Sequence, residues 1–319
     1  MCAITGFFNT KDAAKHTRSV LLILKNRGKD AAGACGAGWV QHFDDVDSLN
    51  ITIPDSNRTA ILGHALHSIV NFVPQPIVYD GRLVANCEIY NWNELAGKYD
   101  IDARNDSDLL IKRIEKRMHK TASAADAMKN IDLLLREFIG VYAVAYWVDD
   151  RVYITRDILG IKPLWYSTQT GFAFASEKKA LEATGYHDVR ELNPREILCY
   201  DIKEDTLTRY NREFFSITPE HGMPVETICS DVRAHIEDAV SIRIPDEPFG
   251  ILFSGGVDST IIAYLCKQLG KRPGVDFTCY VAGFQGETPV PDVEYAKQVA
   301  ETLGLVLKVT EIDLSLIHI

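Results

Sequence analysis

The sequence of 319 residues lacks an excess of positive charge: 34 lysines and arginines stand against 44 aspartates and glutamates, a formal net charge of -10. An acidic surface repels phosphate groups, which disfavours nonspecific nucleic-acid binding and attachment to an anionic membrane. The sequence also lacks an apolar run near the ~18 residues of a membrane span. Its N-terminus lacks the basic and apolar segments of a secretory signal. We therefore expect a cytoplasmic protein.

Cysteine is scarce and is not arranged for cross-linking. The seven cysteines form no Cys-x-x-Cys pair and have no histidine at the spacing of a zinc site. An odd number of scattered cysteines indicates free thiols in a reducing compartment, and we expect the six internal ones to be mostly buried. Cys2, next to the initiator methionine, has a second interpretation.

The composition that is present is that of a globular protein, with 46% apolar and 24% charged residues. At roughly 100–200 residues per domain, the length predicts two domains. Up to about residue 210, short apolar strands alternate with a few helices, and Asp80-Gly81 and Asp149-Asp150 indicate hairpin turns. The spacing of apolar residues predicts helices over 12–25, 107–117 and 122–138. This is an α+β pattern with antiparallel sheets.

The pattern changes after about Tyr210. Residues 225–243 have amphipathic helical spacing, and buried strands then alternate with helices up to residue 309. Strand–helix–strand–helix–strand is the beginning of a parallel α/β sheet. We therefore predict a first domain over 2–204, a linker over 205–224 and a second domain over 225–319.

Cys2 would carry a free α-amino group beside its thiol once Met1 is removed. The reference pKa values are about 7.7–8.0 for an α-amine and about 8.5 for a thiol. A neutral amine can therefore take the thiol proton near neutral pH, so that one residue supplies both nucleophile and base. A cysteine at position 2 is weak evidence by itself, and the motifs that follow it decide its interpretation.

Seven short motifs follow one another along the first domain. They are MCAITG at the start, NRGKD at 26–30, Gly63-His64, ANCEIYN at 85–91, Ser107-Asp108, RDILGIKPLWY at 156–166 and FASEKKAL at 174–181. In this order they resemble the glutaminase domain of class II glutamine amidotransferases, and the last two resemble asparagine synthetase in particular. The resemblance implies an α+β N-terminal-nucleophile (Ntn) fold, in which antiparallel sheets are layered with helices.

The resemblance also implies roles for individual residues. Cys2 matches the nucleophile that attacks the glutamine amide, Asn86 matches the oxyanion-hole side chain, and the backbone N–H of Cys87 matches its second donor. Glu88 and Asp108 match the carboxylates that hold the glutamine ammonium. The full set implied for glutamine binding is Leu66, His67, Ser68, Ile69, Val70, Asn86, Cys87, Glu88 and Asp108.

Several positions depart from the family pattern: Ala3 stands where the family usually has glycine, and Lys29 stands where it often has proline. Two further departures lie in the implied glutamine site. The family has glycine where this chain has Cys87, so that Cys87 must adopt a backbone geometry that suits glycine. The family arginine that clamps the glutamine carboxylate, aligned on His64, is replaced by Leu66, which cannot pair with a carboxylate. His67 is adjacent and could take over this contact when protonated, whereas a structural role is the plainer interpretation of both histidines.

The second domain contains SGGVDS at 254–259, between an expected strand and an expected helix. Two glycines and a helix N-terminus suit an anion, and Asp258 could hold Mg²⁺ near a phosphate. Because no Gly-Lys-Ser/Thr follows, this is not a Walker A loop. The string resembles the pyrophosphate loop of ATP pyrophosphatases. The residues implied for ATP binding are Phe253, Ser254, Gly255, Gly256, Val257, Asp258, Ser259 and Ala282.

A pyrophosphate loop behind a class II glutaminase is the arrangement of asparagine synthetases of the B type. The resemblance implies ATP-dependent amidation of aspartate with ammonia from glutamine, with ATP and Mg²⁺, without nucleic-acid or membrane partners, and in an assembly that could be a homodimer. That family's synthetase domain continues past the last residue of this chain, so we expect this α/β ATP-pyrophosphatase domain to be partial. Two alternatives stay open: an amidotransferase for another carboxylate acceptor, and a non-catalytic remnant with a decayed glutamine site.

Overall fold

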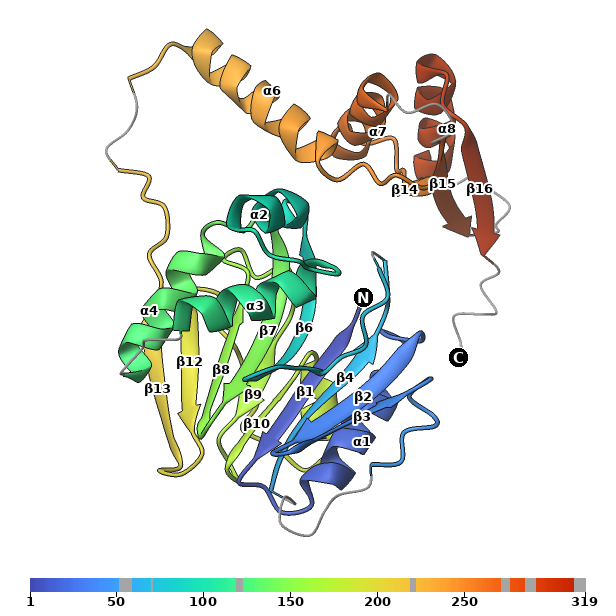
Figure 1. Cartoon of the computed structure of the whole chain (residues 1–319). Helices are drawn as coiled ribbons and strands as arrows, with labels where there is room; N and C mark the ends of the chain where they lie inside the picture. Colours follow the sequence, from blue (N-terminus) through green and yellow to red (C-terminus); the bar gives the residue numbers. More distant parts are fainter. Residues whose placement is uncertain are drawn as a thin grey trace. The chain divides into compact units, whose positions relative to one another are not determined.

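The computed structural model describes residues 1–51, 59–69, 71–118, 123–218, 222–270, 276–284 and 291–312. Its contacts divide the chain into two units, Met1–Ser216 and Ile217–Ile319 (Figure 1). The predicted linker over 205–224 begins too early. Strand β13 (Thr206–Asn211) pairs along its whole length with β12 (Glu196–Asp201), so it belongs to the sheet of the first unit.

The first unit contains two antiparallel sheets, as predicted. The first sheet has the strand order β11-β9-β10-β1-β4-β2-β3 and the second has the order β13-β12-β8-β7-β6-β5. The strands of the first sheet are β1 (Ala3–Phe8), β2 (Ala31–Gly36), β3 (Trp39–Phe43), β4 (Ala60–Leu66), β9 (Trp165–Ser167), β10 (Phe172–Ala175) and β11 (Arg190–Glu191). The remaining strands of the second sheet are β5 (Ile77–Val78), β6 (Arg82–Ile89), β7 (Gly140–Val148) and β8 (Arg151–Arg156).

Helices cover the outer faces of both sheets, so the first unit has four layers (Figure 1). Helices α1 (Ala13–Ile23) and α5 (Lys178–Glu182) pack on the first sheet. Helices α2 (Trp92–Tyr99), α3 (Asp106–Met118) and α4 (Ala124–Leu135) pack on the second. A third apolar cluster, which includes Phe8, Phe172 and Trp147, fills the space between the sheets.

Both hairpins that the turn residues predicted are present. Val78 pairs with Arg82 across the turn that contains Asp80-Gly81, and Val148 pairs with Arg151 across Asp149-Asp150. Asp149 adopts a left-handed conformation with a φ of 49°, which aspartate tolerates better than most residues. These turns set the register of β5 with β6 and of β7 with β8.

In its described residues, the second unit contains a three-stranded parallel sheet in the order β14-β15-β16. A helix precedes each strand along the chain, as the alternating pattern predicted. Its elements are α6 (Val225–Ser241), β14 (Phe249–Leu252), α7 (Val257–Leu269), β15 (Phe277–Phe284), α8 (Pro291–Leu303) and β16 (Leu307–Ile312). The described residues of α6 include none that is buried, although its sequence is amphipathic. Within the ranges given above, no helix combines the length and the apolar character needed to cross a bilayer.

Candidate active site

Cys2 lies directly before β1, the central strand of the first sheet, and only 8% of its surface is exposed. Its Sγ accepts a hydrogen bond from the backbone N–H of His67 at 3.3 Å. Its carbonyl oxygen accepts a hydrogen bond from Nε of Arg27 at 3.1 Å, and Arg27 is held in turn by Glu177 at 2.9 Å. The backbone of His67 therefore holds the Cys2 thiol, and a partly buried ion pair holds the Cys2 carbonyl group.

The NRGKD motif braces this end of the site. Gly28 packs so closely on β4 that a Cβ there would lie 2.4 Å from the carbonyl carbon of Ala65, so a larger residue would push the motif away. Asp30 accepts a hydrogen bond from the N–H of Ser68 at 2.7 Å and lies 3.4 Å from Nδ1 of His67. The motif thus holds the segment that follows β4 against Cys2.

Asn86 reaches Cys2 from β6 of the second sheet. Its Oδ1 accepts a hydrogen bond from the backbone N–H of Cys2 at 3.2 Å. Its Nδ2 is buried and has no hydrogen-bond partner among the described residues. A buried donor without a partner costs roughly 1–3 kcal/mol, so this amide group is available to an oxygen atom that enters the site.

The backbone of β6 offers a second donor beside it. Ala85, Cys87 and Ile89 are alternate residues, so their N–H groups point to the same side of the strand. The N–H of Ala85 is taken by Gln75 and the N–H of Ile89 by Asp106, so this side faces away from β7. The N–H of Cys87 has no hydrogen-bond acceptor among the described residues. Cys87 has no positive φ, so the replacement of glycine does not strain the strand.

These groups line a small pocket of about 40 Å³. That volume is close to the ~30 Å³ of one water molecule, so glutamine needs further space. Met1 is one of the lining residues, and its removal would both open the pocket and free the Cys2 amine. The lining residues are Met1, Cys2, Leu66, His67, Ser68, Ile69, Asn71, Gln75, Ala85, Asn86, Cys87, Glu88, Asn105, Asp106 and Ser107.

Asp108, one of the two carboxylates predicted to hold the glutamine ammonium, lies away from the pocket. Asp108 does not line the pocket: its fully buried carboxylate is paired with Arg104 at 3.1 Å and Lys112 at 3.0 Å, and Tyr79 donates to it at 2.7 Å. Burial raises its pKa, but these hydrogen bonds outweigh burial and hold the pKa of Asp108 below its usual range. The carboxylate of this helix that lines the pocket is that of Asp106. Helix α3 begins at Asp106, and its turn directs Asp108 to the other side.

Glu88, the other carboxylate implied for the glutamine ammonium, lines the pocket and is already paired. Nζ of the buried Lys162 lies 2.6 Å from its Oε1. Asp106 accepts hydrogen bonds from the N–H groups of Ile89 and Ser107 at 3.1 and 2.8 Å. Burial nevertheless raises the pKa of the Asp106 carboxyl. The pocket therefore presents two carboxylates, one of which has a lysine partner that the sequence interpretation missed.

The segment after β4 supplies the other predicted glutamine contacts. Leu66 is buried beside Cys2 and Ala31, so no cation occupies the clamp position. His67, Ser68 and Ile69 all line the pocket, and the side chains of His67 and Ile69 are exposed. Val70 lies outside the described residues.

Burial disfavours charge on both titratable groups at the chain start. It raises the pKa of the Cys2 thiol, partly offset by the backbone hydrogen bond from His67. It also lowers the pKa of the Met1 amine.

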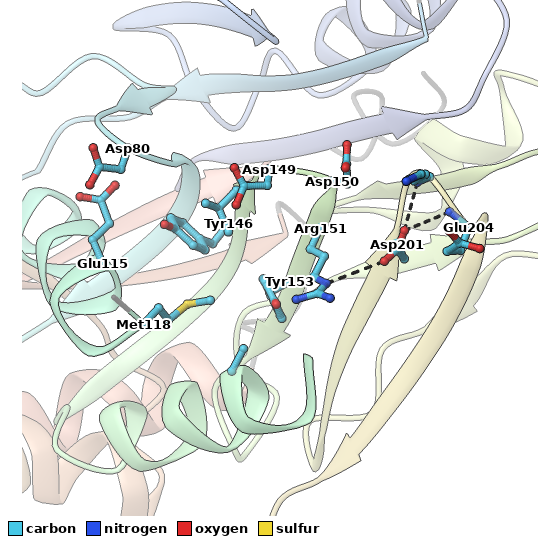
Figure 2. A pocket seen from close by; sticks show the side chains of 13 residues that line it. Asp80, Glu115, Met118, Tyr146, Asp149, Asp150, Arg151, Tyr153, Asp201 and Glu204 are labelled. Atoms are coloured by element: carbon cyan, nitrogen blue, oxygen red, sulfur yellow. Dashed lines mark hydrogen bonds and ion pairs between the residues drawn. The ribbon is translucent and has the colours of Figure 1, made fainter. Parts of the chain in front are cut away.

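A larger pocket of about 790 Å³ lies elsewhere in the first unit, among the hairpin turns (Figure 2). It is lined by six carboxylates and two basic side chains, and Arg151 pairs with Asp201 at 3.7 Å. Among its described lining residues there is no cysteine, serine, threonine or histidine. It therefore offers no nucleophile for amide hydrolysis, and the small pocket at Cys2 is the candidate site.

In the second unit, the predicted phosphate loop joins β14 to α7. Gly255 has a φ of 76°, and a Cβ there would lie 2.9 Å from Cα of Ala296 in α8, so only glycine fits. Gly256 precedes α7, and no side chain caps this helix. The loop is closed by Oγ of Ser254 and Oγ of Ser259 at 3.2 Å. Uncapped N–H groups at a helix N-terminus are suited to bind phosphate.

The other residues predicted for ATP divide into two groups. Val257, Asp258 and Ala282 are exposed, as contacts to a nucleotide require. The side chain of Phe253 is packed in the core of the second unit and is 2% exposed, so only its backbone can face a ligand. No group of three or more histidine, cysteine, aspartate or glutamate side chains suited to a metal ion occurs among the described residues.

Comparison with known proteins agrees with both halves of this description. Residues 69–183 match the family model described as glutamine amidotransferase domain. Residues 231–315 match the model described as asparagine synthase. The two matches fall in the two units of the structure, in the order that the motifs predicted.

Curated relatives match the chain over nearly its whole length. A putative glutamine-hydrolysing asparagine synthetase of Methanocaldococcus jannaschii is 28% identical over 97% of this chain and 58% of that protein. Asparagine synthetase B of Escherichia coli is 25% identical over 96% of this chain and 53% of that protein. The chain thus spans a little over half the length of these two relatives.

Solved structures support the fold. The glutamine phosphoribosylpyrophosphate amidotransferase of B. subtilis aligns with 97% of this chain and 65% of its own, at a TM-score of 0.56 and 17% identity. A second structure, titled as the allosteric regulatory enzyme of purine biosynthesis, aligns with a TM-score of 0.58 and 14% identity. The first unit therefore matches a glutamine amidotransferase family model and the second an asparagine synthase model, and the chain is similar over nearly its whole length to proteins named glutamine-hydrolysing asparagine synthetases, as the motifs predicted.

Proposed function

We propose that the first unit hydrolyses glutamine and that the ammonia serves the synthesis of asparagine from aspartate. The observation that carries this proposal is the contact of Cys2 with Asn86, whose buried Nδ2 has no partner in the part of the chain that the structure describes. A thiol next to an unpaired buried donor is the arrangement that attack on an amide carbonyl requires.

The chemistry follows from groups on two strands. With Met1 removed, the Cys2 amine takes the proton of its own thiol, and Sγ attacks the side-chain amide carbon of glutamine. The oxyanion that forms would be held by Nδ2 of Asn86 and the N–H of Cys87. Collapse of this intermediate passes the proton to the leaving nitrogen, which releases ammonia and leaves a thioester. Water then hydrolyses the thioester to glutamate and regenerates the thiol.

The α-ammonium of glutamine is assigned to Asp106 and Glu88, because both carboxylates line the pocket. Asp108, which the sequence interpretation selected, is excluded from this role by its burial beside Arg104 and Lys112. Ser68 and Ile69 also line the pocket, where their backbone groups would contact the rest of the substrate.

The second unit is assigned to ATP. The loop from Ser254 to Ser259 would hold the phosphates, and Asp258 would hold Mg²⁺ beside them. ATP bound there would supply the adenylyl group that activates the β-carboxylate of aspartate. Support for this assignment comes from the uncapped start of α7 and from the asparagine synthase match.

A second candidate, a remnant without glutaminase activity, is favoured by one observation. Leu66 is buried where a cation for the glutamine carboxylate is expected, and the pocket is small. Cys2 keeps hydrogen bonds with both Asn86 and Arg27, which argues against decay.

The two candidates are separated by one experiment on the purified chain. Intact mass spectrometry should show the loss of Met1, and release of glutamate and ammonia from glutamine should be measurable. A chain that has lost Met1 but hydrolyses no glutamine would support the remnant. Hydrolysis that persists with Met1 retained would show that the free Cys2 amine is not the base.

A further inference from the structure

The nucleophile and its proposed oxyanion donor belong to different sheets. Cys2 precedes β1 of the first sheet, whereas Asn86 lies in β6 of the second. Only one hydrogen bond, from the Cys2 N–H to Oδ1 of Asn86, is recorded directly between them. Any contact that sets β6 relative to the first sheet at this point therefore also sets the distance from the thiol to Nδ2 of Asn86.

Gln75 makes such a contact with the residue before Asn86. Its Oε1 accepts a hydrogen bond from the N–H of Ala85 at 2.7 Å, and its Nε2 donates to the carbonyl oxygen of Ala85 at 3.2 Å. Gln75 is 4% exposed. Because β5 pairs with β6 only at Arg82 and Leu83, the side chain of Gln75 makes the two hydrogen bonds that a neighbouring strand would make.

The backbone around Gln75 is anchored to the first sheet. The carbonyl oxygen of Gln75 packs against Gly33 of β2, where a Cβ would lie only 2.2 Å from it. The carbonyl oxygen of Pro76 accepts a hydrogen bond from Nε2 of His42 in β3 at 3.1 Å. His64 of β4 adds a third link, because its Nε2 donates to the carbonyl oxygen of Ala85 at 3.1 Å.

We propose that Gln75 is a positioning residue that fixes Asn86 for catalysis, an inference that rests on the proposed glutaminase function. The carbonyl carbon of Ala85 is bonded to the nitrogen of Asn86, so clamping the Ala85 peptide fixes where Asn86 begins. Gln75 contacts no reacting atom in this scheme. It acts through the position of the Asn86 amide, and His64 supports it from the adjacent strand.

The primary test is Gln75→Met, which removes both hydrogen bonds and keeps the side-chain length. A misplacement of about 1 Å costs roughly 100-fold in rate, so kcat for glutamine hydrolysis should fall by about 10–100-fold. KM should change little, because the substrate-binding carboxylates are untouched. Gln169→Met is the matched control: Gln169 also bonds backbone groups, those of His187 and Gly185, but away from the site.

A double-mutant cycle shows whether the effect passes through Asn86. Asn86→Ala alone should lower kcat by about 10²–10³-fold. If Gln75 acts by placing Asn86, Gln75→Met should cost almost nothing further in that background. Full additivity of the two losses would overturn the proposal, because it would mean that Gln75 acts independently of Asn86.

Alkylation of Cys2 by iodoacetamide, followed by peptide mass spectrometry, separates positioning from general damage. This reaction forms no oxyanion, so its rate in Gln75→Met should match that of the wild type. A parallel loss of alkylation rate and kcat would point to a collapsed pocket and contradict the proposal.

If Gln75→Met does not fold, Gln75→Glu provides a second test. Its protonated carboxyl can both accept from and donate to Ala85, whereas the carboxylate cannot donate. The ratio of its kcat to that of the wild type should therefore rise as the pH falls, and a flat ratio would overturn the proposal. A wild-type chain without glutaminase activity would overturn the proposed function and, with it, the positioning role of Gln75. Active wild type with unchanged kcat in Gln75→Met would overturn the role of Gln75 alone.

Discussion

The two units build their candidate sites in different ways. In the first unit, Cys2, Asn86 and Asp106 come from the start of β1, from β6 and from α3, so their positions depend on how two sheets and a helix pack. In the second unit, the candidate phosphate site is one continuous loop, and its recorded hydrogen bonds are internal, as between Ser254 and Ser259. A site assembled from distant elements is sensitive to remote substitutions, whereas a local loop is sensitive to its own sequence.

The helices of the two units differ in how many of their side chains are buried. Eight residues of α3 are buried against the second sheet and its neighbours, including Leu109, Leu110 and Ile114. In α6, by contrast, Val225, Val232 and Ile236 stay exposed, and none of its residues is buried. In the first unit, apolar side chains buried between helix and sheet therefore stabilise the fold. The helix α6 of the second unit buries fewer side chains, so burial protects the second unit's loop less from local opening.

The largest expected effect is the loss of glutaminase activity in Cys2→Ala. Removal of a catalytic nucleophile costs about 10⁶-fold in kcat in a well-studied protease, and a fall of at least ~10⁴-fold is expected here. The fold should survive, because the residue is small and lies at the chain start. Measurement of glutamate release with far-UV circular dichroism as a folding control checks this, and near wild-type hydrolysis would remove Cys2 from the mechanism.

The next effect distinguishes two neighbouring acids of α3. Asp106→Asn should raise the glutamine KM by about 10–100-fold, because it removes a charge-assisted contact worth roughly 1.5–3 kcal/mol. Because the pKa of Asp106 is raised, the wild-type KM should also increase as the pH falls through that value. Steady-state kinetics across pH measure both effects, and an unchanged KM in Asp106→Asn would return the assignment to Glu88 alone.

Asp108→Asn should instead lower the free energy of unfolding by about 1–3 kcal/mol and leave KM unchanged. The folded pKa of Asp108 is depressed, so its carboxylate contributes stability above the unfolded value of about 3.9 and loses it as the pH falls towards the folded value. The wild type and Asp108→Asn should therefore converge in stability below about pH 4. Urea unfolding at neutral and acidic pH tests this, and a constant difference would contradict it.

A smaller effect is expected at the missing clamp. Leu66→Arg should lower the glutamine KM by about 10-fold if no other cation holds the carboxylate. If His67 holds it, Leu66→Arg should change little and His67→Ala should raise KM. KM values that respond to neither substitution would place the carboxylate contact on another residue.

The smallest effect on glutamine hydrolysis is expected from the second unit. Gly255→Ala should destabilise the loop by about 1–3 kcal/mol, because alanine disfavours its positive φ and would meet the backbone of Ala296. Gly256→Ala is the matched control, since its Cβ would meet only Oγ of Ser254 at 3.3 Å. Hydrogen exchange of the segment from β14 to α7 reports the difference, and glutaminase activity should be equal in both variants. A loss of glutaminase activity in Gly255→Ala would show that the units are not independent.

Local signals in the sequence determined much of the fold. Turn pairs such as Asp80-Gly81, helical spacing over 107–117 and the strand–helix alternation after residue 225 all depend on near neighbours, and each element is present. Strand β2 gave no such signal, because AAGACG has low intrinsic preference for a strand. Its pairing with β3 and β4 and its burial in the first sheet make it a strand.

The residues of the candidate site also differ in whether the sequence alone could identify them. Cys2, Asn86 and Glu88 could be found because the motifs around them resemble those of a known family, and Asn86 and Glu88, two residues apart in β6, share one face of the strand. Asp106 could not be told from Asp108 by motif alone, since the start of α3 decides which one faces the pocket. The tertiary structure alone decided that Lys162 pairs with Glu88 and that Gln75 clamps Ala85, because these contacts join residues that only the packing of the first unit brings together.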